Sequence, residues 1–73
     1  MKKKTAKQMF EDLGYSVLAD NEYAISYENG EKQNVVTFWY EDLIIEYMPS
    51  FAAKIDIPLL QAINQQCKEL EWI

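Results

Sequence analysis

Histidine and arginine are absent from this chain, and cysteine occurs once, as Cys67. Histidine is the side chain most often used as a general base near neutral pH and as a metal ligand, and arginine is the usual partner of phosphate groups. These absences exclude histidine-dependent catalysis, cysteine–histidine zinc sites and arginine-based recognition of phosphate. A lone thiol forms no disulfide within the chain and is typical of a reducing compartment, so we expect a cytoplasmic protein.

Long apolar runs are also absent, and we therefore expect no membrane-spanning segment. The basic start at residues 2–4 is not followed by the apolar stretch of a signal peptide. Nearly half of the 73 residues are hydrophobic, which is enough for one packed core. We expect a single domain over residues 1–73, with residues 1–4 disordered.

The charge is acidic and unevenly distributed. Four of the seven lysines lie within the first eight residues, so residues 9–73 hold three lysines and all twelve acidic residues. Such a surface repels nucleic-acid backbones and anionic membranes. We therefore expect no direct binding to nucleic acid or membrane.

The pattern at the start of the chain predicts a short amphipathic helix. Thr5 and Gln8 have the spacing of a capping box, and Gly14 is placed where a left-handed residue ends a helix. The apolar residues between them follow one helical stripe: Ala6, Met9, Phe10 and Leu13.

A second helix is predicted near the end of the chain. Asp56 is a suitable N-cap, Pro58 falls in the first turn, and we expect the helix to run to about Glu71. Its main inward stripe is expected to comprise Leu60, Ile63, Cys67 and Leu70, flanked by Leu59 and Ala62.

Residues 15–48 change to a period of two, which predicts strands. The expected strands cover residues 15–19, 23–28, 34–40 and 43–48, with a hairpin turn at Asn29-Gly30 and a stop at Pro49. Large side chains alternate onto one face, namely those of Tyr23, Ile25 and Tyr27 and those of Leu43, Ile45 and Tyr47. Residues 51–55 are compatible with either a short edge strand or a loop. The chain is therefore expected to be an α+β domain, in which both helices lie on one face of an antiparallel meander of three to four strands.

The two helical segments together resemble a group of small phage proteins. Residues 5–15, with the letters TAKQMFEDLGY, are similar to the opening of small uncharacterised proteins of Gram-positive phages and prophages. Residues 60–66, LQAINQQ, followed by Glu69-Leu70 and Trp72, are similar to their ending. The resemblance implies a context and a fold and supplies no site residues. Those proteins usually have glycine before the terminal tryptophan, where this chain has Glu71, so the second helix is expected to run on.

Candidate reactive groups are few. Cys67 falls on the apolar stripe of the second helix, without a histidine to activate it, and we interpret it as a core residue. The closest carboxylate pairs are Glu11-Asp12, Glu41-Asp42 and Glu28/Glu31, and none has the spacing of a calcium loop. We therefore expect no enzyme activity, no cofactor, no metal and no small-molecule substrate.

The strand at residues 34–40 is apolar on both faces. Val36, Phe38 and Tyr40 point one way, and Val35, Thr37 and Trp39 point the other. Two short helices cover only one face of a sheet, so apolar surface remains, which commonly marks a protein contact. The candidate interaction surface comprises Val35, Thr37, Trp39, Glu41 and Asp42.

The sequence thus favours a protein-binding or self-associating module, with a protein partner or a homodimer. Two alternatives stay open: an acidic nucleic-acid mimic that inhibits a host DNA-binding enzyme, and a small carboxylate-dependent hydrolase.

Overall fold

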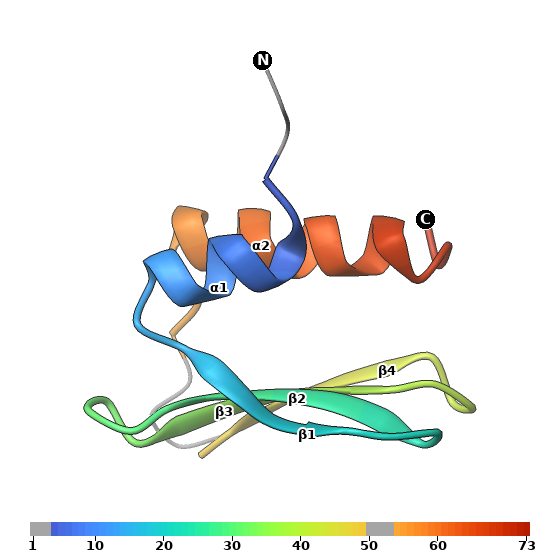
Figure 1. The fold of residues 1–73 in the computed structure, drawn as a ribbon, viewed down its shortest axis with the longest axis horizontal. Coiled ribbons are helices and arrows are strands. Elements are labelled where there is room, and N and C mark those ends of the chain that lie inside the picture. The colour runs from blue at the N-terminus through green and yellow to red at the C-terminus, as the bar shows by residue number, and fades with distance from the viewer. Residues whose placement is uncertain (1–3, 50–53) are drawn as a thin grey trace.

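The computed structural model describes residues 4–49 and 54–73, in which two helices lie on one side of a four-stranded sheet (Figure 1). The elements in chain order are α1 Ala6–Asp12, β1 Ser16–Asp20, β2 Ala24–Asn29, β3 Asn34–Trp39, β4 Ile44–Met48 and α2 Ile57–Glu69. Neighbouring strands are antiparallel and lie in sequence order, so the sheet is a meander. The α+β helix–meander–helix fold is confirmed.

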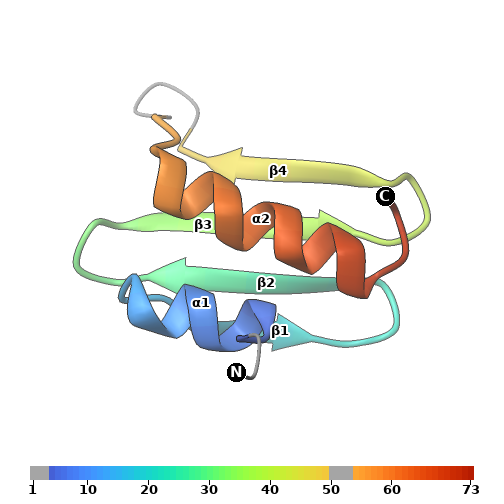
Figure 2. The ribbon, with the colours of Figure 1, turned by 90° about the horizontal axis from the view of Figure 1, so that it is seen from above.

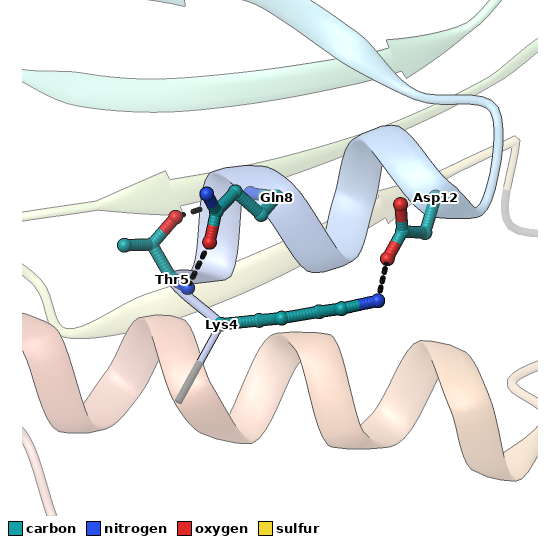
Figure 3. A network of polar contacts seen from close by, with 4 residues as sticks. All are labelled: Lys4, Thr5, Gln8 and Asp12. Atoms are coloured by element: carbon teal, nitrogen blue, oxygen red, sulfur yellow. Dashed lines mark hydrogen bonds and ion pairs between the residues drawn. The ribbon is translucent and has the colours of Figure 1, made fainter. Parts of the chain in front are cut away.

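Two segments named in the sequence analysis, residues 1–4 and residues 51–55, are only partly described by the structure. Residues 1–3, which belong to the stretch expected to be disordered, and residues 50–53 are outside the described residues. Lys4 is described, and its ammonium pairs with the carboxylate of Asp12 (Figure 3). Lys54 and Ile55 lie in neither a helix nor a strand.

Helix α1 begins with the predicted capping box (Figure 3). The hydroxyl of Thr5 accepts from the backbone N–H of Gln8 at 3.2 Å, and the Thr5 N–H donates to the Gln8 side chain at 2.9 Å. The N–H of Ala6 donates to a carboxylate oxygen of Glu69 at 2.7 Å, which ties the start of α1 to the end of α2. These three contacts satisfy N–H groups that a helix leaves unpaired at its first turn.

Helix α1 ends in a Schellman motif, a closure in which two N–H groups beyond the helix bond back to its last turn. Gly14 has a φ of 91° and donates to the carbonyl of Glu11 at 3.0 Å, and Tyr15 donates to the carbonyl of Phe10 at 2.9 Å. The side chains of Phe10 and Tyr15 then meet edge to face, with ring centroids 5.5 Å apart. The predicted stop at Gly14 is confirmed.

Helix α2 ends in the same motif, so the expectation that it runs on through Glu71 is wrong. Glu71 has a φ of 62° and donates to the carbonyl of Lys68 at 3.0 Å, while Trp72 donates to the carbonyl of Cys67 at 2.8 Å. Glutamate therefore occupies a left-handed position that usually holds glycine. The closure turns Trp72 toward the core, where its ring lies 6.3 Å from that of Phe38.

The core lies between the helices and the sheet. Its largest fully buried side chains are those of Tyr27, Phe10, Phe38 and Val36. Phe10 stacks on Tyr27 with ring centroids 4.0 Å apart, and Phe38 meets both rings nearly at right angles. The Tyr27 hydroxyl donates to the side chain of Gln66 on α2, so α1, two central strands and α2 converge here.

The buried face of α2 confirms most of the predicted stripe. It comprises Leu59, Ala62, Ile63, Gln66 and Cys67, and the partly buried Leu70 packs against the same core. Leu60, expected inward, is 49% exposed. Gln66 is buried instead, because its hydrogen bond to Tyr27 allows a polar side chain on the buried face, and hydrophobic spacing alone does not reveal this position.

The turns also differ from expectation. Asn29 is the last residue of β2, pairs with Asn34 and has no positive φ, so Asn29-Gly30 is not a two-residue turn. The loop spans residues 30–33 and places Gln33 in the left-handed region, with a φ of 56°. The β3–β4 loop, residues 40–43, does the same at Leu43, which removes Leu43 from the inner face where it was expected.

Removal of the Phe10 ring from the core should unfold a large fraction of the protein. We expect Phe10→Ala to lower the free energy of unfolding by about 3–5 kcal/mol, because the ring is fully buried. Leu60→Ala should cost less than about 1 kcal/mol, because half of that side chain is already in water. Urea denaturation followed by circular dichroism compares the two, and equal losses would contradict the assignment of the α2 face.

Relief of the left-handed glutamate should stabilise the protein. A left-handed conformation costs a non-glycine residue about 1–2 kcal/mol, so Glu71→Gly should raise the free energy of unfolding by about 1 kcal/mol and Tm by about 4–8 °C. Gln61→Gly, inside α2, is the control and should destabilise by about 1 kcal/mol. A lower Tm for Glu71→Gly would contradict the geometry at this helix end.

Candidate functional site

The face of the sheet opposite the helices, here called the outer face, has no covering element among the described residues (Figure 1). Residues paired across an antiparallel ladder point to the same face. The buried residues Val36 and Phe38 face the helices, so their neighbours in β3 and the partners of those neighbours point outward. The outer face is therefore formed on three strands by Ala24, Ser26, Glu28, Val35, Thr37, Trp39, Ile44, Glu46 and Met48.

The centre of the outer face is made of small side chains and its margin of large ones. The hydroxyl of Ser26 donates to that of Thr37 at 3.0 Å, and neighbouring side chains leave both residues only 7% exposed. Around them, Trp39, Ile44 and Met48 remain substantially exposed. The outer face is thus a shallow apolar surface with one satisfied polar pair at its centre.

The structure places Val35, Thr37 and Trp39 on this face, as strand alternation predicts. Thr37 is too buried to offer much contact area, whereas Trp39 is 41% exposed. Sequence reasoning missed Ile44 and Met48, although alternation about the predicted inward residues of β4 could have identified them. The accessible apolar contact is therefore centred on Trp39 and β4.

A hollow of about 440 Å³ lies at one end of the sheet, beside Trp39. Figure 2 shows that the β1–β2 and β3–β4 turns lie together at this end and the β2–β3 turn at the other. The hollow is lined by Glu22, Tyr23, Trp39, Glu41 and Asp42. It brings the predicted Glu41 and Asp42 next to the predicted Trp39, and it adds two residues from a turn far away in the sequence.

Hydrogen bonds hold the walls of this hollow in place. The side chain of Asn21 accepts from the N–H groups of Tyr23 and Ala24, at 2.8 and 3.2 Å. The carbonyl of Tyr23 accepts from the N–H of Tyr40 at 3.0 Å, which joins the first turn to the end of β3. Tyr23 was expected on the inner face of the sheet, but this turn leaves it 68% exposed.

Three carboxylates and two aromatic rings line the hollow. The indole N–H of Trp39 donates to a carboxylate oxygen of Glu46 at 3.3 Å, which orients the ring across the outer face. Burial, followed by the charge of Asp20, raises the pKa of nearby Tyr40. Two aromatic rings and three carboxylates around one hollow are suited to a cation, because rings and carboxylates both attract positive charge.

Strand β4 borders the outer face and is poorly covered on both sides. Ile45 faces the helices, yet it remains over one-third exposed while its β3 partner Phe38 is fully buried. Figure 2 shows α2 crossing above β3 and β2, with β4 along the outer margin. The other edge strand, β1, carries an extra residue at Leu18 that interrupts its pairing with β2. The regular and partly apolar edge of β4 can therefore accept another strand more readily than the interrupted edge of β1.

A second cavity, of about 490 Å³, lies between the ends of the helices and the sheet. The side chain of Asn34 donates to the hydroxyl of Tyr47 at 2.9 Å, and that hydroxyl donates to the carbonyl of Lys54 at 3.4 Å. Burial, followed by Tyr47 and Asp56, raises the pKa of Tyr15 to about 12. These bonds join β3 and β4 to the segment that precedes α2, which is a structural role.

The predicted carboxylate pairs are not brought together. Glu11-Asp12 lies on α1, Glu41-Asp42 in the β3–β4 turn, and Glu28 and Glu31 in β2 and the loop after it. Within residues 4–49 and 54–73, no group of three or more histidine, cysteine, aspartate or glutamate side chains could hold a metal ion. No helix in this part of the chain has the length and apolar content needed to cross a membrane.

The chain was compared with protein families, curated proteins and solved structures. No family model matches it, and no curated protein or solved structure does so either.

Cys67 should be unreactive in the folded protein. The thiol is buried on α2, and burial raises its pKa, so the thiolate that reacts with disulfide reagents is scarce below the pKa. We expect labelling by Ellman's reagent at pH 8 to be at least about tenfold slower in the native protein than in urea. Equal rates would show that Cys67 is accessible.

Proposed function

We propose that this protein is a non-enzymatic protein-binding module that contacts its partner through the outer face. The observation that carries the proposal is the exposure of Trp39, Ile44 and Met48 on a sheet face that neither helix covers. Water-exposed apolar patches with a charged rim are a common feature of protein contacts. Burial of a side chain as large as an indole contributes about 2 kcal/mol, which makes Trp39 the expected centre of the contact.

The same reasoning supports a binding role over a hydrolytic one. A general-acid carboxylate needs a site shielded from water, and the three carboxylates that share the hollow, Glu22, Glu41 and Asp42, are all exposed. The alternative of an acidic nucleic-acid mimic has a different signature, because a contact of carboxylates with a basic cleft weakens steeply with salt. An apolar contact persists in high salt.

We further propose that the chain belongs with the small phage and prophage proteins of Gram-positive bacteria. Support comes from the resemblance of residues 5–15 and 60–72, which here form the capped α1 with its glycine stop and most of α2. The single buried cysteine supports a place in a reducing cytoplasm.

Site-specific photocross-linking tests the binding surface. A benzophenone amino acid placed at Met48, on the outer face, should give one discrete protein adduct in a lysate of the source organism. The same group at Gln61, exposed on α2, is the matched control and should give none. Trp39→Ala should reduce the Met48 adduct by at least about tenfold, since the indole is the expected centre of the contact.

Two outcomes would contradict the proposal. Identical adducts from Met48 and Gln61 would show that the outer face has no special role. An adduct that disappears in high salt but is unchanged by Trp39→Ala would favour the mimic, because a mimic's contact depends on carboxylates and not on the indole. Sedimentation of the purified protein at micromolar concentration, in low and in high salt, shows whether the cross-linked partner can be a second copy of the chain.

A further inference from the structure

Among the described residues, no lysine lies on the outer face or in the turns at its hollow end. The acidic residues there are Glu22, Glu28, Glu41, Asp42 and Glu46. The described lysines all lie elsewhere: Lys4 and Lys7 at α1, Lys54 and Lys68 at α2, and Lys32 in the turn at the opposite end of the sheet (Figure 2). The apolar surface therefore lies in a field of one sign, and a favourable partner carries the opposite sign.

The hollow gives this charge a specific place to act. Its aromatic walls come from Tyr23 and Trp39, and three carboxylates surround them. The Asn21 side chain and the bond from the Tyr40 N–H to the Tyr23 carbonyl hold the turn in position without a ligand. A lysine or arginine side chain meets there both the ring faces that attract cations and the carboxylates that neutralise them.

We propose that the outer face binds a basic segment of another protein, and that one lysine or arginine of this segment enters the hollow between Tyr23 and Trp39. The inference rests on the proposed function and names its partner chemistry. Apolar side chains of the segment lie on Trp39, Ile44 and Met48, and the flanking basic residues face Glu41, Asp42 and Glu46.

Charge also argues against a second copy of the chain on this face. Two outer faces brought together would oppose five carboxylates with five others, and no lysine of residues 4–49 or 54–73 lies on this face to compensate. Like charges brought together in a contact are destabilising. A basic partner removes this repulsion and gains attraction.

Binding of two synthetic peptides to the purified protein tests the inference. One peptide alternates lysine with leucine and valine, and the other has glutamine at each lysine position. We expect the lysine peptide to bind at least about tenfold more tightly at low salt. Trp39→Ala should weaken its binding by about tenfold, while Leu60→Ala, which removes an exposed apolar side chain from α2, should change it less than about twofold.

The chain offers a matched control for charge. Glu41→Gln/Asp42→Asn and Glu11→Gln/Asp12→Asn remove the same two charges from the same dipeptide, one at the hollow and one on α1. The Glu41/Asp42 variant should bind the lysine peptide about three- to tenfold more weakly than the unmodified protein, and the Glu11/Asp12 variant should change its affinity by less than about twofold. Circular dichroism melting curves should confirm that all these variants remain folded.

Three results would overturn the inference. They are equal binding of the two peptides, equal losses from the two dipeptide variants, and a dimer in sedimentation that Trp39→Ala dissociates. A Met48 cross-link to another protein, together with equal peptide binding, would leave the proposed function standing and remove only the basic partner. Absence of any outer-face adduct, together with selective lysine-peptide binding, would instead contradict the cellular role and retain the chemistry of the hollow.

Discussion

The ring of Phe10 lies flat on that of Tyr27, and Phe38 meets both rings at nearly right angles. In this cluster aromatic rings from α1, β2 and β3 all contact one another. The Tyr27 hydroxyl extends the cluster to Gln66 of α2. Aromatic pairs have preferred orientations, so the contact sets the angle between layers as well as their separation. Because four elements meet at a few rings, the position of each helix over the sheet depends on them.

The helix ends supply further aromatic side chains to the same cluster. Each helix closes with a Schellman motif, and in each the residue after the left-handed position is aromatic, Tyr15 in one case and Trp72 in the other. The closure reverses the chain direction within two residues, so a ring just beyond the helix turns back against its last turn. The terminal bonds and the core thus stabilise one another. A short α1 and a longer α2 lie on one face of the sheet, and no described element covers the opposite face.

Local patterns predicted most of the fold, because they depend on residues close in sequence. The Thr5 capping box, the stop at Gly14, the Asp56 cap and the alternation in β3 all required only neighbours within a turn or a strand. On α2 the exchange of Leu60 for Gln66 on the buried face was missed, because Gln66 is buried through a bond to a residue far away in the sequence. Glu71 was misread because the tertiary contact of Trp72 favours a left-handed residue that local preference disfavours. The loops at Gln33 and Leu43 were missed for the same reason: strand pairing determines their length.

The candidate site likewise has one part that local pattern predicted and one part that depends on tertiary contacts. Alternation correctly located Val35, Thr37 and Trp39 on one face. The hollow, however, is formed by Tyr23 and Glu41, which β2 and β3 separate in the sequence but which lie near one another in the fold. In a meander, every second turn lies at the same end of the sheet. That rule, applied to the acidic turns at residues 20–22 and 41–42, is the signal by which the sequence could have revealed the hollow.

The extra residue at Leu18 in β1 has a consequence for the size of any assembly. A bulge bends an edge strand and disrupts its ladder, which makes that edge a poor template for another strand. Of the four described strands, only β4 then has an edge that stays open along its length. An added strand would bring a free edge of its own, but copies of this chain could pair only β4 to β4, so edge pairing between copies would stop at two. Unlimited fibre growth would require both edges, and the bulge removes one of them.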